Sequence, residues 1–169
     1  TLTSLNCLLN EYKQNGTYKA IIIVPTIALL NQWKSECYKF NFKNLITVSS
    51  KEDWNNKISF YNTASQFIET SFIVIVTYNS FQSDKFQSHF KQLPKDTLLI
   101  ADEVHNLGSP GISKMLDEIH LQKRIGLSAT PNRKYDDAGN DAIESFFKDK
   151  SPYIFSYSME KALANGWLC

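Results

Sequence analysis

The sequence predicts an α/β fold in which a doubly wound, mostly parallel sheet carries helices on both faces. Continuous apolar runs rich in β-branched residues, such as residues 20–24 and 72–76, are typical of strands buried on both faces of a parallel sheet. Stretches with apolar residues at helical spacing separate these runs. A chain of 169 residues with 43% hydrophobic and 13% aromatic content is large enough to bury the core of one compact domain.

The predicted strands and helices alternate along the chain. Strands are predicted at 20–24, 45–48, 72–76, 97–101 and, more weakly because Gly126 interrupts the pattern, 123–127. Helices are predicted at 2–15 with Gly16 as the stop signal, at the stripe of Leu30, Trp33, Cys37 and Phe40, at 112–119, around Phe146 and Phe147, and at 158–165 with Ser158 as the cap. The polar segment 51–61 is predicted as a loop, with a helix left open.

The charge balance gives no global field that would attract nucleic acid or an acidic membrane. Lys and Arg number 18 against 17 for Asp and Glu, for a net charge of +1. This disfavours a free-standing basic DNA binder. Any contact with a phosphate backbone then comes from backbone amides and helix N-termini or from local cations such as Lys123, Arg124, Arg133 and Lys134.

Three cysteines, Cys7, Cys37 and Cys169, are widely spaced and form no Cys-x-x-Cys pair. This pattern fits neither a disulfide framework nor a zinc site, and it favours a reducing, cytoplasmic setting. The longest apolar run, residues 20–24, is far too short to span a bilayer, and no signal-peptide pattern follows Thr1, so no membrane partner is expected. The start without Met and the end at Cys169 indicate a fragment, and we interpret both termini as cuts.

Polar clusters directly follow four of the predicted strands. In open α/β sheets, ligands bind outside the carboxyl ends of the strands, so these clusters are the candidates for chemistry. They are Pro25-Thr26, Thr77-Tyr78-Asn79-Ser80, Asp102-Glu103-Val104-His105 and Ser128-Ala129-Thr130-Pro131. Because the strands are predicted to be parallel, we expect the four loops to meet at one edge of the sheet, with the adjacent acids near the amino end of the first helix.

The adjacent acids Asp102 and Glu103 are the most informative pair. Two carboxylates at the end of a hydrophobic strand are costly without a cation, because desolvation and mutual repulsion both disfavour the charged forms. Mg²⁺ binds through one or two carboxylates together with substrate phosphates. This predicts Asp102 as the Mg²⁺ ligand and Glu103 as the group that orients or deprotonates an attacking water. The alternative is a solvated turn that leads to Gly108 and Pro110.

Together the four clusters resemble the motifs of superfamily-two helicases of the DEAH-like kind. Residues 102–105 resemble the Walker B box, motif two, and residues 128–131 resemble motif three. The remaining matches are to motif Ia, in Val24-Pro25-Thr26 with Leu30, Gln32 and Trp33, and to the segment between Ia and two, in Val76-Thr77-Tyr78. Order and approximate spacing agree over essentially the whole chain. Gln32-Trp33 and Pro131-Asn132-Arg133 are most similar to the branch that contains restriction-subunit and DNA-repair translocases.

This resemblance implies the first RecA-like lobe, a P-loop NTPase lobe, of an ATP-dependent helicase or translocase. Residues 1–155 are then the nucleotide-binding domain, and residues 156–169 begin the linker to a second lobe. ATP and Mg²⁺ are the implied cofactors, and nucleic acid, with DNA favoured over RNA, is the implied partner. Hydrolysis of ATP between the two lobes would drive movement along that nucleic acid.

The main departure from the family is a missing segment. The glycine-rich Gly-Lys-Ser/Thr loop that cradles the phosphates does not occur in this sequence. Thr1, or alternatively Thr3, is expected to be the last residue of that loop, and Thr1 would then contact the nucleotide and Mg²⁺. The fragment alone is expected to be inactive.

The resemblance also implies coupling roles. His105 would couple the nucleotide to motif three, where Ser128, Ala129 and Thr130 would link hydrolysis to movement of the lobes. A histidine that merely caps or hydrogen-bonds is the alternative for His105. Satisfying backbone groups at the strand end is the other reading for Ser128 and Thr130, and the two readings are compatible.

Nucleic-acid contacts are implied for a further set of residues: Pro25, Thr26, Gln32, Thr77, Tyr78 and Arg133. Thr26 and the helix after it would hold a phosphate through a hydroxyl and N-terminal amides, and an ordinary helix cap is the alternative. Arg133 either faces phosphate or is a solvated charge. Trp33 shares a stripe with Leu30 and Cys37, so core packing is favoured over base stacking.

Two other functional classes stay open at this point. One is a non-hydrolysing nucleic-acid-binding or assembly module on the same fold, which a Gly-Lys-Ser/Thr motif encoded upstream of Thr1 would argue against. The other is a different P-loop enzyme such as a small kinase, which phosphoryl transfer to water rather than to an acceptor would argue against.

Overall fold

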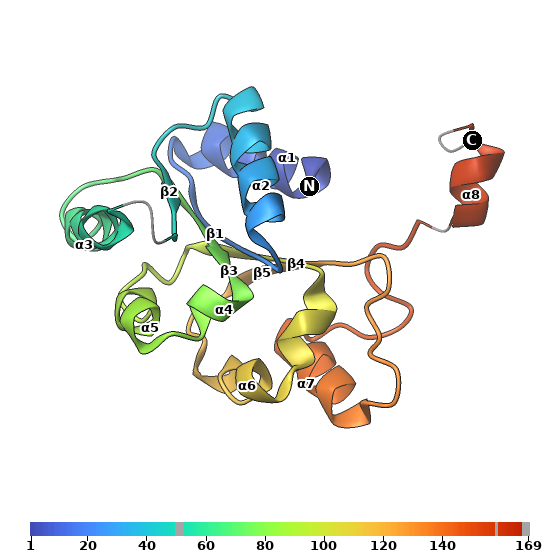
Figure 1. Cartoon of the computed structure of the whole chain (residues 1–169). Helices are drawn as coiled ribbons and strands as arrows, with labels where there is room; N and C mark the ends of the chain where they lie inside the picture. The colour runs from blue at the N-terminus through green and yellow to red at the C-terminus, as the bar shows by residue number, and fades with distance from the viewer. Residues whose placement is uncertain (50–52, 158, 167–169) are drawn as a thin grey trace.

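A computed structural model describes residues 1–49, 53–157 and 159–166 of the chain. Its centre is a five-stranded, all-parallel sheet with the order β2-β3-β1-β4-β5 (Figure 1). The strands are β1 (Lys19–Val24), β2 (Leu45–Thr47), β3 (Phe72–Thr77), β4 (Leu98–Asp102) and β5 (Lys123–Leu127). The predicted parallel α/β sheet is confirmed.

Helices cover both faces of this sheet. The described helices are α1 (Leu2–Asn15), α2 (Ile27–Lys39), α3 (Trp54–Ala64), α4 (Tyr78–Phe81), α5 (Asp84–Phe90), α6 (Pro110–Ser113), α7 (Asp137–Phe147) and α8 (Met159–Ala164), with 3₁₀ turns η1 (Val104–Gly108) and η2 (Leu116–Glu118). Of these, α8 lies apart from the sheet (Figure 1). Helices α1 and α2 cover one face, and α4 to α7 cover the other (Figure 1). None of the helices in the described ranges has the length and apolar character needed to cross a membrane.

Each face of the sheet has its own hydrophobic core. On one face, Leu5, Leu8 and Trp33 pack against alternate residues of the strands, including Ile22 and Ile100. The other face is rich in aromatic residues, and its core includes Tyr78, Phe81, Phe86, Phe90 and Phe146. Since β1 lies in the middle of the sheet, its residues Ala20 to Val24 are completely buried. This burial explains the continuous apolar run that predicted the strand.

Three local predictions differ from the structure. Residues 112–119 form no single helix but the short α6 followed by η2, although Ile112, Leu116 and Ile119 are buried as their spacing suggested. Residues from Trp54 onward form α3 rather than a loop, because Ile58 packs on the sheet. Helices α4 and α5 were not predicted, since they are too short to give a clear period. Ser158, the expected cap of the last helix, lies outside the described residues.

The carboxyl ends of four strands lie in register. Val24 pairs with Thr77, Ile23 pairs with Ala101, and Asp102 pairs with Leu127. The four polar clusters therefore leave the sheet along one edge, as predicted. Moreover, β1 and β4 are neighbours whose following helices lie on opposite faces, which is the arrangement that defines a ligand-binding switch point in open α/β sheets.

Two glycines allow α7 to lie directly against the turn after β4. A Cβ at Gly108 would approach Cδ of Arg133 to 2.6 Å and the carbonyl oxygen of Gly139 to 2.8 Å. A Cβ at Gly139 would in turn meet the carbonyl oxygen of Gly108 at 2.8 Å. The backbones of η1 and α7 therefore touch where side chains would separate them.

We predict that Gly108→Ala destabilises the chain by about 1–3 kcal/mol, because the added methyl group overpacks a backbone contact that cannot yield. Urea unfolding followed by circular dichroism measures this. Gly111→Ala is the matched control, since its methyl group would meet only the flexible end of Gln82. Equal midpoints for the two variants would contradict the close contact.

Candidate active site at the carboxyl edge of the sheet

Asp102, the last residue of β4, is held by three hydrogen bonds. The Nε1–H group of Trp33 donates to its Oδ2 at 2.7 Å, and the backbone N–H of Glu103 donates to its Oδ1 at 3.1 Å. The hydroxyl of Tyr78 donates to its backbone carbonyl at 2.8 Å. Each carboxylate oxygen has two lone pairs. Each oxygen of Asp102 therefore keeps acceptor capacity for a further ligand.

Glu103 changes the direction of the chain directly after the strand. Its φ of 50° lies in the left-handed region, which is uncommon for a residue with a side chain. The carbonyl of Glu103 accepts two hydrogen bonds from Asn106, one from the backbone N–H at 3.0 Å and one from Nδ2 at 2.8 Å. These bonds stabilise a conformation that is otherwise costly. Asn106 was not identified from the sequence, because nothing there indicated a left-handed residue at 103.

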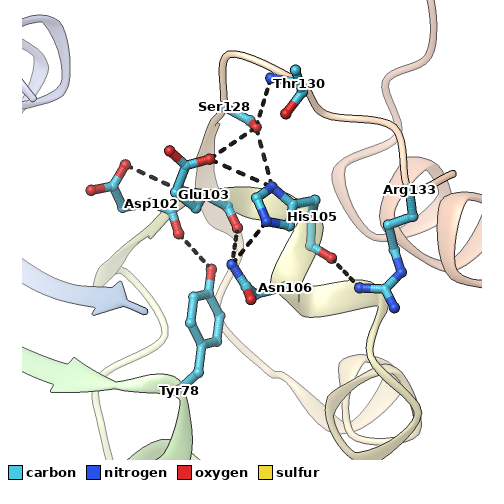
Figure 2. Close-up of polar contacts among 8 residues, drawn as sticks. All are labelled: Tyr78, Asp102, Glu103, His105, Asn106, Ser128, Thr130 and Arg133. Carbon is cyan, nitrogen blue, oxygen red and sulfur yellow. Dashed lines mark hydrogen bonds and ion pairs between the residues drawn. The ribbon is translucent and has the colours of Figure 1, made fainter. Parts of the chain in front are cut away.

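The side chains of Glu103, His105 and Ser128 meet between the loops that follow β4 and β5 (Figure 2). Oγ of Ser128 donates to Oε2 of Glu103 at 3.3 Å, and Nδ1 of His105 lies 3.5 Å from both of these atoms. The backbone N–H of Thr130 donates to Oγ of Ser128 at 3.1 Å, whereas the side chains of Ala129 and Thr130 are exposed. The predicted acid, histidine and motif-three serine thus form one polar cluster.

Arg133 forms a second connection between the loops that follow β4 and β5. Its Nη1 donates to the carbonyl of His105 at 2.8 Å (Figure 2). Its Nε donates to Asp136 at 2.5 Å. Asn140 accepts from the backbone N–H of Arg133 at 2.7 Å. The guanidinium is therefore not a simple solvated charge, since two of its nitrogens have protein partners. Instead it connects the end of motif three to the backbone of motif two.

Tyr78 and Thr77 have internal partners. The ring of Tyr78 is only 6% exposed, and burial, with the nearby charges of Asp102 and Glu103, raises the pKa of its hydroxyl far above the usual range. Thr77 accepts from the backbone N–H of Ser80 at 3.2 Å and so caps α4. Tyr78 supports the end of β4 and Thr77 begins α4, and the burial of both side chains gives no support to a contact with nucleic acid.

The amino end of α2 is open by contrast. Thr26 is exposed and caps the helix by accepting from the backbone N–H of Leu29 at 3.2 Å, so the expected cap is present. Pro25 is half-buried, and Gln32 is exposed on the second turn of α2. These residues leave a polar surface at the switch point that a ligand can reach.

Trp33 is 1% exposed in the core between α2 and the sheet, which confirms the predicted packing. Its hydrogen bond to Asp102 was not foreseen. A signal for it exists in the sequence, because a buried tryptophan N–H needs an acceptor and the neighbouring strand ends in carboxylates.

Thr1 is exposed at the start of α1. Later in this helix Glu11 forms an ion pair with Lys123, the first residue of β5. A helix rises about 1.5 Å per residue, so Thr1 lies about 15 Å from Glu11 along the axis of α1. Since Leu5 and Leu8 pack on the sheet between these two points, the amino end of α1 lies away from the amino edge at which β5 begins.

The acid pair does not complete a metal site by itself. Within the described part of the chain, no group of three His, Cys, Asp or Glu side chains could hold a metal ion by itself. Mg²⁺ needs only one or two protein carboxylates when phosphate oxygens and waters complete its octahedral shell. The partly accessible carboxylate of Asp102, with unused lone pairs on both oxygens, fits this kind of shared site.

Comparison with known proteins agrees with this fold and these motifs. Residues 1–133 match the family described as Type III restriction enzyme, res subunit, and the chain belongs to this family. The parallel sheet, the motif order and the family together define the chain as the first, RecA-like lobe of a superfamily-two helicase.

Two curated relatives are similar over most of the chain. The putative DNA 3'-5' helicase Rad25 of Haloarcula marismortui is 31% identical over 119 residues, which is 70% of this chain and 17% of that protein. The DNA 3'-5' translocase XPB2 of Sulfurisphaera tokodaii is 32% identical over 113 residues, 67% of this chain and 21% of that protein. The matched region thus spans about a fifth of each relative's length.

Two solved structures share the fold. A nuclease-deletion mutant of the Type ISP restriction-modification enzyme LlaGI, in complex with a DNA substrate mimic, superposes with a TM-score of 0.65 at 20% identity, covering 97% of this chain and 17% of that one. The SWI2/SNF2 ATPase core of Sulfolobus solfataricus, in complex with dsDNA, gives a TM-score of 0.61 at 20% identity, covering 86% and 28%. At this identity the likeness supports the fold alone.

The bond between Arg133 and Asp136 predicts a pH dependence. The hydrogen bond from Arg133, together with that from the backbone N–H of Gly139, lowers the pKa of Asp136. A carboxyl with a depressed folded pKa contributes stability that is present above its unfolded value, about 3.9, and is lost as the pH falls through the folded value. We predict that Arg133→Met raises the pKa of Asp136 toward the ordinary value and removes this acid-dependent loss.

Carboxyl ¹³C NMR titration and urea unfolding between about pH 2 and pH 5 measure both effects. Lys134→Met, at the exposed neighbouring residue, is the control for loss of one positive charge. An Asp136 pKa that is the same in the Arg133 variant and in the unmodified chain would show that the bond does not form.

Proposed function

We propose that this lobe is one half of an ATP-driven motor that moves along DNA, with the nucleotide bound at the carboxyl edge of the sheet. The observation that carries the proposal is the junction of Glu103, His105 and Ser128, which joins the acid pair after β4 to the motif-three loop after β5. An acid pair at the start of a merely solvated turn would need no such junction.

In this proposal each residue of the junction has a separate task. Asp102 would hold Mg²⁺, which neutralises negative charge on the nucleotide phosphates when bound. The side chain of Glu103 is 41% exposed, so its carboxylate can orient a water molecule and accept its proton. Because Glu103 contacts Ser128 directly and His105 contacts both of them, a change at the acid pair would reach the motif-three loop by both routes.

The remaining parts of the motor are also proposals. We assign residues 1–155 to the lobe and residues 156–169 to the beginning of the linker to a second lobe, which would supply arginines to the nucleotide. The parent protein would carry its Gly-Lys-Ser/Thr loop just before α1, with Thr1 near Mg²⁺. Helix N-termini favour anions, so the direction of α1 supports phosphate binding there. Without these parts the lobe alone would not turn over ATP.

DNA is the nucleic acid along which we propose that the motor moves. The names of both relatives state action on DNA, and both solved structures were determined with DNA or a DNA mimic. Within this chain we propose Pro25, Thr26 and Gln32 as the contacts, because the amino end of α2 offers exposed polar groups and backbone amides to a phosphate.

We predict that Glu103→Gln in the full-length motor lowers DNA-stimulated ATP turnover by about 10²- to 10⁴-fold, because the amide cannot accept the proton of the attacking water. A phosphate-release assay measures this, and filter binding of ATP should be unchanged. Glu118→Gln, at an exposed acid in η2, is the matched control. Turnover near that of the unmodified motor would reject the catalytic assignment and would favour a non-hydrolysing binding module.

A separate prediction concerns DNA binding by α2. Gln32→Ala should weaken binding of a DNA duplex roughly fivefold, since loss of one hydrogen bond costs about 1 kcal/mol. Fluorescence anisotropy with a labelled duplex measures the affinity, and Asn31→Ala, at the exposed neighbour on α2, is the control. If both variants bound DNA equally well, Gln32 would not be a contact.

A further inference from the structure

Trp33 combines two properties that packing alone does not require. Its side chain is 1% exposed, and its single polar group, the indole N–H, is a donor without acceptor capacity. That donor ends on Oδ2 of Asp102 at 2.7 Å, a short distance typical of a hydrogen bond to a charged acceptor. The two residues are 69 positions apart in the chain, so only the tertiary fold brings them together.

The bond fixes one oxygen of the carboxylate that the proposed function assigns to Mg²⁺. Oδ1 is already bonded to the backbone N–H of Glu103, and the carbonyl of Asp102 is bonded to Tyr78. Without Trp33, the carboxylate would keep only a local bond to the next residue in sequence and would rotate more freely. Tyr78 fixes the backbone of Asp102 from one face of the sheet, whereas Trp33 fixes its side chain from the other.

The same side chain also connects Asp102 to α2. Trp33 packs beside Leu30 and Cys37 on the buried stripe of this helix, whereas Thr26 and Gln32 face solvent. A buried aromatic ring packed in a dense core does not change position independently of its helix. A shift of α2 would therefore alter the hydrogen bond at Asp102 directly.

We propose that Trp33 is a positioning residue that orients the Asp102 carboxylate for Mg²⁺ and joins it to the DNA-facing helix α2. This inference rests on the proposed function, because it assumes Asp102 as the metal ligand. Residues that hydrogen-bond a metal ligand typically contribute about 10- to 100-fold to metal affinity or activity.

The first test reads the hydrogen bond itself. In ¹H–¹⁵N spectra of this chain, the indole resonance of Trp33 is identified by its loss in Trp33→Phe, and it should exchange with solvent more slowly than the resonance of Trp54. Asp102→Ala should shift the Trp33 resonance and speed its exchange, whereas Glu118→Ala should do neither. An unchanged Trp33 resonance in Asp102→Ala would overturn the proposal.

The second test uses the full-length motor. Trp33→Phe should raise the Mg²⁺ concentration for half-maximal ATP turnover by about 10- to 100-fold and reduce stimulation by DNA, while the Kd for DNA stays within about twofold. Trp54→Phe is the matched control, since Trp54 lies on the other face of the sheet beside Phe86 and His89.

A third variant removes the risk that a smaller ring disturbs the core. Incorporating the benzothiophene isostere of tryptophan at position 33 replaces the N–H by sulfur and keeps the bicyclic shape. It should reproduce the altered Mg²⁺ dependence. If this variant has a normal Mg²⁺ dependence while Glu103→Gln inactivates the motor, the positioning role of Trp33 is rejected and the proposed function is not. Full turnover in Glu103→Gln would instead reject the proposed function.

Discussion

The fixed position of Asp102 at the end of β4 is the constraint on which the rest of the site depends. Its side chain and its carbonyl are hydrogen-bonded from opposite faces of the sheet, by Trp33 and by Tyr78. The strand itself is buried between two cores, so the last residue of β4 cannot move without disturbing both. The residues of the site that follow in the chain are positioned relative to this fixed end of β4.

Directly after Asp102 the chain turns sharply, so that the carboxylate of Glu103 leaves the line of the strand. The left-handed conformation of Glu103 achieves this turn, and Asn106 offsets its cost. The glycines at 108 and 139 then allow α7 to approach, and Arg133 closes the connection onto the backbone of His105. The loops that follow β4 and β5 are therefore connected twice. The side chains of Glu103, His105 and Ser128 form one connection, and the guanidinium of Arg133 on the carbonyl of His105 forms the other.

A site built in this way suits a lobe that works against another lobe. Two bridges connect the loops after β4 and β5. In the proposed motor, a change at the acids would therefore move both loops as one connected unit. The amino end of α2 belongs to the same unit through Trp33. In the proposed motor, the sheet would carry a nucleotide-facing surface and a DNA-facing surface that share residues at the switch point.

The sequence by itself determined the parallel sheet, the order of the motifs and the edge where they meet, because buried strands need continuous apolar runs and parallel strands end on one side. It also determined that Trp33 packs in the core. It did not determine the partner of the indole N–H, the left-handed Glu103 or the internal use of Tyr78 and Arg133. These depend on contacts between segments that are distant along the chain, and such contacts exist only once the layers have packed. Local periodicity specifies which face of an element is buried, but only the tertiary structure decides which buried polar groups find one another.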